Sequence, residues 1–199
     1  MYVISIALAI FGLLSWGNIS AQNASNVASQ QDITSKIALE SKELLTFAQG
    51  ALDLTTEIGA AGGGESISLA TLESNHLLPI SFPTETPFGQ TWNAFYVLDH
   101  TTGLADLLIW PSGSVEYAGN MSSQYIAARV VQRLSSLQDN LQTSNQFLIG
   151  NGINQIYLGT SVNNTLIISS GFQTIPLSER CGNAITNYEP VMFIDFTNP

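Results

Sequence analysis

The chain has 199 residues, with 15 acidic and 5 basic side chains and a formal net charge of −10. This balance, without any basic cluster, argues against nucleic-acid binding and against attachment to an anionic membrane surface, because both depend on Lys and Arg beside phosphates. Charged residues make up 10% of the chain, against roughly 25% in ordinary soluble domains. A surface of Ser, Thr, Asn and Gln is typical of exported proteins, and it suits contacts between subunits because few charges must lose water there.

The first predicted element is an apolar stretch over residues 1–17, and the first charged side chain of the sequence is Asp32. As a helix this stretch would be about 25 Å long, close to the roughly 30 Å hydrocarbon core of a bilayer. It is longer than a signal-peptide core of about 7–15 residues. Such a segment must be buried in lipid, in a translocon or against copies of itself. We predict that its larger apolar side chains form these membrane and assembly contacts: Ile4, Ile6, Leu8, Ile10, Phe11, Leu13, Leu14 and Trp16.

Residues 18–31 are uncharged and rich in Asn, Ser and Gln, residues that weaken helices by competing for backbone hydrogen bonds. They fit either a soft continuation of the first helix or a linker. Residues 32–58 predict an amphipathic helix, which the glycines at 59 and 62–64 should end. Its apolar stripe has spacings of three, four or seven and consists of Ile33, Ile37, Leu44, Ala48, Ala51 and Ile58. The charged residues are expected largely away from that stripe: Lys36, Glu40, Lys42, Glu43, Asp53 and Glu57.

The sequence therefore divides into an N-terminal helix over residues 1–58 and a head over residues 59–199. A single helix over the first part would be about 87 Å long. In the head, the pattern predicts a short helix over 68–76, a proline-rich loop, a hairpin of strands 89–98 and 104–110, and a second amphipathic helix over 122–141. Further short strands are expected at 115–117, 146–149, 153–158, 165–170 and 191–196. This order predicts an α+β fold, in which a long N-terminal helix and a second helix pack against a small antiparallel sheet.

The sequence contains no cluster of the residue types that commonly act in catalysis. His76 and His100 are the only histidines, and the single cysteine, Cys181, is expected to be a small buried residue. No metal-ligand spacing, nucleophile elbow or phosphate-binding loop is present in the sequence. We therefore predict a protein that is not an enzyme and binds no cofactor or metal, although two carboxylates that meet in space would leave glycoside hydrolysis open.

The aromatic residues of the predicted hairpin have two interpretations. Trp92, Phe95, Tyr96 and Trp110 lie on its two strands. Cross-strand aromatic pairs are common in sheet cores, so we predict that these four residues belong to the core. A surface on which sugars stack is the alternative.

Four sequence blocks resemble the N-terminal constant region of the shufflon-type (PilV-like) minor pilins of type IV pili. They are TLESNHLLPISF (71–82), TPFGQTWNAFYV (86–97), LLIWPSG (107–113) and YIAARVVQRL (125–134). Together with the apolar first helix, the resemblance covers roughly residues 1–140. The chain departs from the family at Ser5, where pilins usually carry Glu, and it shows no basic leader before the apolar run.

The resemblance implies a structural and adhesive pilus subunit with a pilin-like spine. Such subunits are held in the bacterial inner membrane by a single pass of the apolar helix, and they then pack through that helix with other pilin subunits in an extracellular pilus. It also implies a cell-surface glycan or lipopolysaccharide as a receptor, and the sequence leaves both a tip and a shaft position open. The alternative is a soluble exported binding module, secreted or periplasmic, whose first twenty-odd residues are a signal peptide with weak cleavage sites around Ala21 and Ala24.

Overall fold

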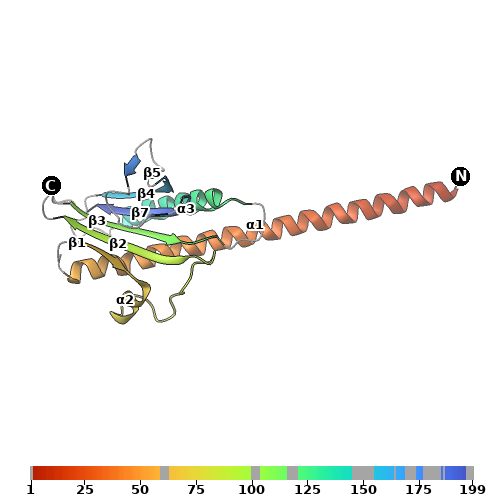
Figure 1. Cartoon of the computed structure of the whole chain (residues 1–199). Helices are drawn as coiled ribbons and strands as arrows, with labels where there is room; N and C mark the ends of the chain where they lie inside the picture. Colours follow the sequence, from red (N-terminus) through yellow and green to blue (C-terminus); the bar gives the residue numbers. More distant parts are fainter. Residues whose placement is uncertain are drawn as a thin grey trace. The chain divides into compact units, whose positions relative to one another are not determined.

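The computed structural model (Figure 1) confirms the α+β class, with helices and one antiparallel sheet. The chain divides into two compact units, Met1–Lys36 and Ile37–Pro199. For residues 2–21, and for a few residues at the ends of elements, the structure describes the backbone but not the side chains. The structure describes residues 2–58, 63–99, 104–115, 121–144, 155–163, 165–168, 174–176, 185 and 187–195.

Helix α1 (Tyr2–Ile58) contributes residues to both units. In the first unit, residues 22–32 are all exposed. The hydroxyls of Ser29, Thr34 and Ser35 donate to carbonyls four residues earlier, at 3.0, 2.8 and 2.9 Å. Helix α1 continues without a break through residues 18–31, as the helical alternative for this Asn- and Ser-rich stretch predicts.

In the second unit, α1 is a core element. The predicted apolar stripe is confirmed by the burial of Ile37, Leu44, Ala48 and Ala51, while the side chain of Ile58 is outside the described residues. Burial extends beyond the stripe to Phe47, Leu52 and Leu54. One expectation was wrong: Glu40, which we placed away from the stripe, has no exposed surface.

The described strands form one sheet in the order β1-β2-β3-β7-β4-β5-β6, and all its strand pairs are antiparallel. The predicted hairpin is confirmed, with a register that runs from Thr91↔Ser112 to Asp99↔Leu104. The strand expected at 146–149 lies outside the described residues, and so does most of the one at 115–117. The strand bounds are β1 Gly63–Ile67, β2 Thr91–Asp99, β3 Leu104–Ser112, β4 Gln155–Val162, β5 Thr165–Ile168, β6 Thr174–Pro176 and β7 Pro190–Asp195.

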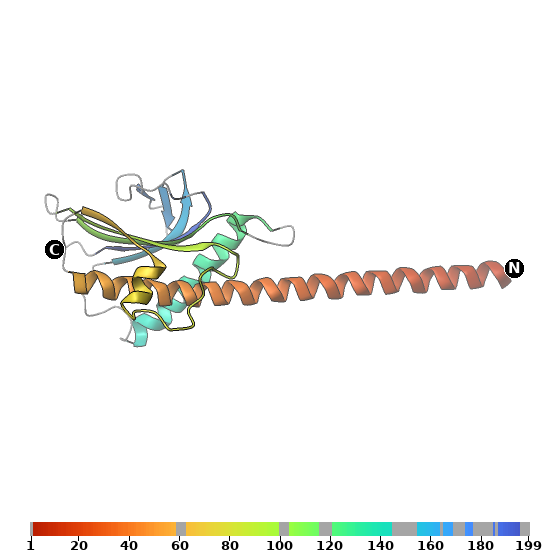
Figure 2. The same ribbon diagram turned by 60° about the horizontal axis from the view of Figure 1, so that its bottom comes forward.

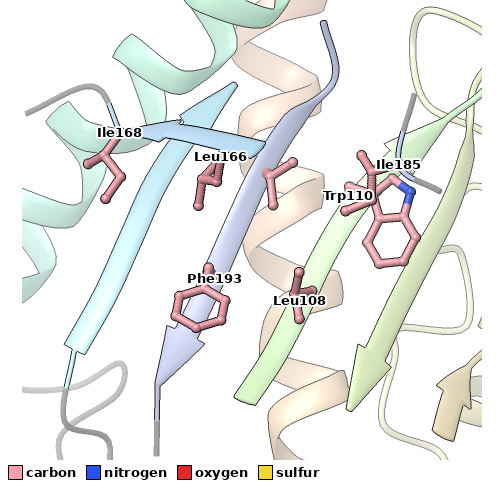
Figure 3. Packing of buried hydrophobic residues seen from close by; sticks show 7 residues of the cluster. Leu108, Trp110, Leu166, Ile168, Ile185 and Phe193 are labelled. Atoms are coloured by element: carbon pink, nitrogen blue, oxygen red, sulfur yellow. The ribbon is translucent and has the colours of Figure 1, made fainter. Parts of the chain in front are cut away.

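The central strands are buried on both faces. Helices α1 and α3 (Ser123–Ser144) cover one face (Figure 2), and α3 contacts β4 and β7. The opposite face carries a second apolar cluster (Figure 3), with α1 passing behind the strands in that view. The cluster consists of Leu108, Trp110, Leu166, Ile168, Ile185, Val191 and Phe193. Two buried faces explain why β3 and β7 read as nearly continuous apolar runs rather than alternating ones.

A segment between α2 (Leu69–Ser74) and β2, residues 75–90, packs over α1, and we call it the cover segment. Ser68 caps α2 by accepting a hydrogen bond from the Thr71 amide at 3.1 Å. Gly50 of α1 allows close approach, because a Cβ there would lie 2.9 Å from the carbonyl oxygen of Leu77. The backbone of the cover segment therefore rests directly on the helix.

Strand β1 was not predicted, since its two glycines were interpreted only as the end of the preceding helix. They begin a strand that pairs with β2, with Ser66 opposite Phe95. The ring of Phe95 fills the space that a Cβ on Gly64 would occupy. A larger residue at this position would therefore require the Phe95 ring to move.

Gly159→Ala is expected to destabilise the sheet by about 1–3 kcal/mol, the usual cost of overpacking. A Cβ at this position of β4 would collide with the carbonyl oxygen of Ile167 on β5 and would approach the side chain of Leu166. Urea denaturation should show a lower midpoint for this variant, whereas Ser66→Ala, at an exposed strand position, should retain the wild-type midpoint. Equal midpoints for the two variants would contradict the close β4–β5 contact.

Candidate functional site

The residues predicted to make membrane and assembly contacts lie on α1. Their backbone is helical, but the side chains of Ile4, Ile6, Leu8, Ile10, Phe11, Leu13, Leu14 and Trp16 lie outside the described residues. In the part of the chain that the structure describes, no helix carries an apolar run of the length and hydropathy that a membrane span requires.

Two of the four hairpin aromatics, Trp92 and Trp110, belong to the core as predicted, whereas Phe95 and Tyr96 are only partly buried. Trp92 and Trp110 are each only 4% exposed. Trp92 faces α1 and donates its indole N–H to the Pro83 carbonyl at 3.1 Å. Trp110 belongs to the cluster on the opposite face, against which the half-buried Phe95 also packs. Neither tryptophan offers a face on which a sugar could stack.

The residues considered for catalysis are not brought together. His76 is exposed, with a left-handed backbone at φ 57°, after α2. His100 and Cys181 lie outside the described residues. Within the described ranges, no three His, Cys, Asp or Glu side chains are grouped so that they could hold a metal ion.

Two acids do meet across the sheet. Asp106 of β3 lies opposite Asp195 of β7 in the strand register, and Asp106 has no exposed surface. Both residues take part in interactions within the protein.

The unusual site of the described structure lies on α1 beneath the cover segment. Glu40 and Glu43, one helical turn apart, bring two carboxyl groups to the same face. Glu40 is fully buried, and its carboxyl oxygens make no well-aligned hydrogen bond to a described residue, although the Thr86 side chain lies near enough to interact with them. The nearby hydroxyl oxygen of Thr86, itself buried, accepts hydrogen bonds from the amides of Phe88 and Gln90 at 3.1 and 3.2 Å.

Burial decides the protonation of this site. It raises the pKa of Glu40 from 4.5 to about 8, and the negative charge of Glu43 adds to the shift, while the Thr86 side chain acts in the opposite direction. Burial also raises the pKa of Glu43, against the influence of Lys42. At neutral pH Glu40 is therefore predominantly a neutral carboxylic acid.

The sequence contained a signal for this site that we did not use. Glu40 follows Ile37 by three residues and precedes Leu44 by four, so helical geometry places it on the apolar stripe. We instead expected it, with the other charged residues of this helix, largely away from that stripe, in keeping with the rule that charged side chains are almost never fully buried.

No protein-family model matches this chain, and neither does any curated protein or solved structure. The grounds for a functional assignment are therefore the sequence pattern and the geometry described above.

Proposed function

We propose that this chain is a structural subunit of a type IV pilus-like filament. Before assembly, the apolar end of α1 anchors it in the bacterial inner membrane as a single pass. In the extracellular filament, the same end packs against other subunits. The observation that carries the proposal is α1 itself, a helix of 57 residues whose first part is apolar and free of charge and whose last part is buried in an α+β unit.

The physical reason for this proposal is the difference in polarity between residues 1–17 and the rest of α1. An apolar surface in water is unfavourable, so residues 1–17 need an apolar environment throughout the life of the protein. Lipid supplies it before assembly, and the helices of neighbouring copies replace lipid in a filament. A position at the tip and a glycan or lipopolysaccharide receptor remain predictions of the family resemblance.

The N-terminus of the protein recovered from its host tests the proposal. The intact mass of the protein in membranes and in sheared filaments should include residues 1–17. A chain that begins near residue 22 and behaves as a soluble monomer would overturn the proposal and favour the exported binding module.

Leu8→Asp should shift the protein from the membrane to the soluble fraction without unfolding the second unit. A charged side chain at mid-bilayer costs about 2.5–3.5 kcal/mol on insertion scales, or about a 70- to 400-fold change in partitioning. Carbonate washing of membranes, with circular dichroism of the released protein, measures both effects. Thr34→Asp, at an exposed position of the same helix, is the control and should stay in the membrane. Unfolding of the released variant would show that the second unit depends on the apolar end.

A further inference from the structure

One face of α3 concentrates positive charge in an otherwise acidic chain. Tyr125, Arg129 and Arg133 follow one another at intervals of four residues, so they share a face, and all three are exposed. The Arg129 guanidinium lies 5.8 Å from the centre of the Tyr125 ring and donates to Gln132 Oε1 at 2.9 Å. We call Tyr125, Arg129 and Arg133 the arginine stripe.

The arginine stripe is not neutralised within the part of the chain that is described. Neither Arg129 nor Arg133 forms an ion pair with a described residue, although acidic side chains outnumber basic ones 15 to 5. No acidic residue occurs between residues 121 and 138. Guanidinium groups bind carboxylates through two parallel hydrogen bonds, so this stripe is suited to an acidic protein surface.

The same unit carries exposed acids on the segment that runs from β1 to the start of β2. Residues 63–90 contain three acids and no Lys or Arg. These acids are Glu65 on β1, Glu73 on α2 and Glu85 on the cover segment, all exposed and none ion-paired with a described residue. We call them the acidic edge, because β1 is the terminal strand of the sheet.

The two surfaces belong to opposite halves of the sheet. The acidic edge is attached to β1, whereas α3 contacts β4 and β7, beyond β3 in the strand order. In Figure 1, α2 and α3 lie on opposite sides of the helix α1. Within the described part of one copy no ion pair joins the stripe to these acids, and a second copy can supply the partner.

We infer that the arginine stripe of one copy binds the acidic edge of the next copy. Two different surfaces meet in such a contact, so it is heterologous and repeats in one direction, as a ring or an open filament requires. The inference rests on the proposed function, because a filament places copies of this unit side by side. It adds to that function the surfaces that fix which side of one subunit faces the next.

Charge reversal tests this pairing on the full chain in its host, with the yield of sheared filaments as the measurement. Arg129→Glu with Arg133→Glu should reduce the yield roughly tenfold or more, because like charges then face each other across the contact. Glu73→Lys with Glu85→Lys should have the same effect. The variant that combines all four changes should recover most of the wild-type yield, because the attraction is restored with its direction reversed.

A control for added negative charge is Ser114→Glu with Thr174→Glu, which adds two negative charges, against four for the double arginine reversal, at exposed positions on neither surface. This variant should assemble as the wild type does. Wild-type yield from either reversed pair, or no recovery in the combined variant, would overturn the inference while the filament itself stands. Failure of the wild-type chain to enter any filament would instead overturn the proposed function, and the inference with it.

Discussion

Glu40→Gln is expected to increase the free energy of unfolding at pH 7 by about 3 kcal/mol, since each unit of pKa shift corresponds to about 1.4 kcal/mol. The carboxyl group is fully buried without a well-aligned hydrogen bond to a described residue, and its pKa is raised from 4.5 to about 8. Below pH 4.5 the group is protonated in both the folded and the unfolded chain. Between pH 4.5 and about 8 the unfolded chain loses the proton and the folded chain keeps it, so stability falls as pH rises.

Above about pH 8 Glu40 ionises in the folded chain as well, and the total loss of unfolding free energy levels off at about 5 kcal/mol. Glutamine is neutral at every pH, so the variant should lose most of this pH dependence. The raised pKa of Glu43 contributes in the same direction and should leave a smaller slope. The measurement is urea denaturation of the full chain in a mild detergent at pH 5, 7 and 9.

Glu73→Gln is the matched control, because it makes the same chemical change at an exposed position of α2. Its stability and pH profile should follow those of the wild type. If Glu40→Gln gave the wild-type profile as well, the carboxyl group would have to be hydrated or paired, and the closed contact between α1 and the cover segment would be wrong.

The protonation of Glu40 also bears on the acidic edge. Thr86, which interacts with Glu40, follows Glu85, a member of that edge. Ionisation of Glu40 places a negative charge beneath the cover segment, where it disfavours the closed packing. The packing of the cover segment next to Glu85 should therefore loosen as the pH rises through about 8.

The local sequence pattern was sufficient to predict those helices and strands in which apolar residues recur at a regular helical or strand spacing. The helix over 32–58, the hairpin and the helix over 122–141 were predicted and correspond to the end of α1, to β2–β3 and to α3. Arg129 and Arg133 of this second helix are both exposed, as its amphipathic pattern requires of charged residues. In each of these elements, the residue types and the spacing of the apolar residues favour the same secondary structure. The element can therefore be predicted without knowledge of any distant part of the chain.

The remaining features depend on contacts between segments far apart in sequence. Glycine at position 64 is explained only by the ring of Phe95, thirty-one residues later in the sequence. Glu40 is buried only because the cover segment, which brings Thr86, closes over the helix. For the same reason, the burial of Glu40 beside Glu43 could not be predicted from residue types, although the helical spacing places Glu40 on the apolar stripe.

Phe47→Ala should lower the free energy of unfolding by about 3–5 kcal/mol, the usual cost of removing a buried aromatic side chain. Phe47 has no exposed surface, and its ring centre lies 6.2 Å from that of Phe82 and 5.8 Å from that of Trp92. Phe82 and Trp92 are themselves 5.6 Å apart. The three rings join α1, the cover segment and β2, so the cavity would open where all three segments meet.

Phe47→Leu keeps most of the volume and should cost clearly less, while Lys42→Ala, at an exposed position of α1, should change stability by no more than about 0.5 kcal/mol. Urea denaturation followed by tryptophan fluorescence measures all three variants. Because the ring also fixes the cover segment, Phe47→Ala should reduce filament yield together with stability, whereas reversal of the arginine stripe should reduce yield alone. A loss below about 1 kcal/mol for Phe47→Ala would mean that α1 is not a core element of the second unit, and the helix could then not link that unit to a filament.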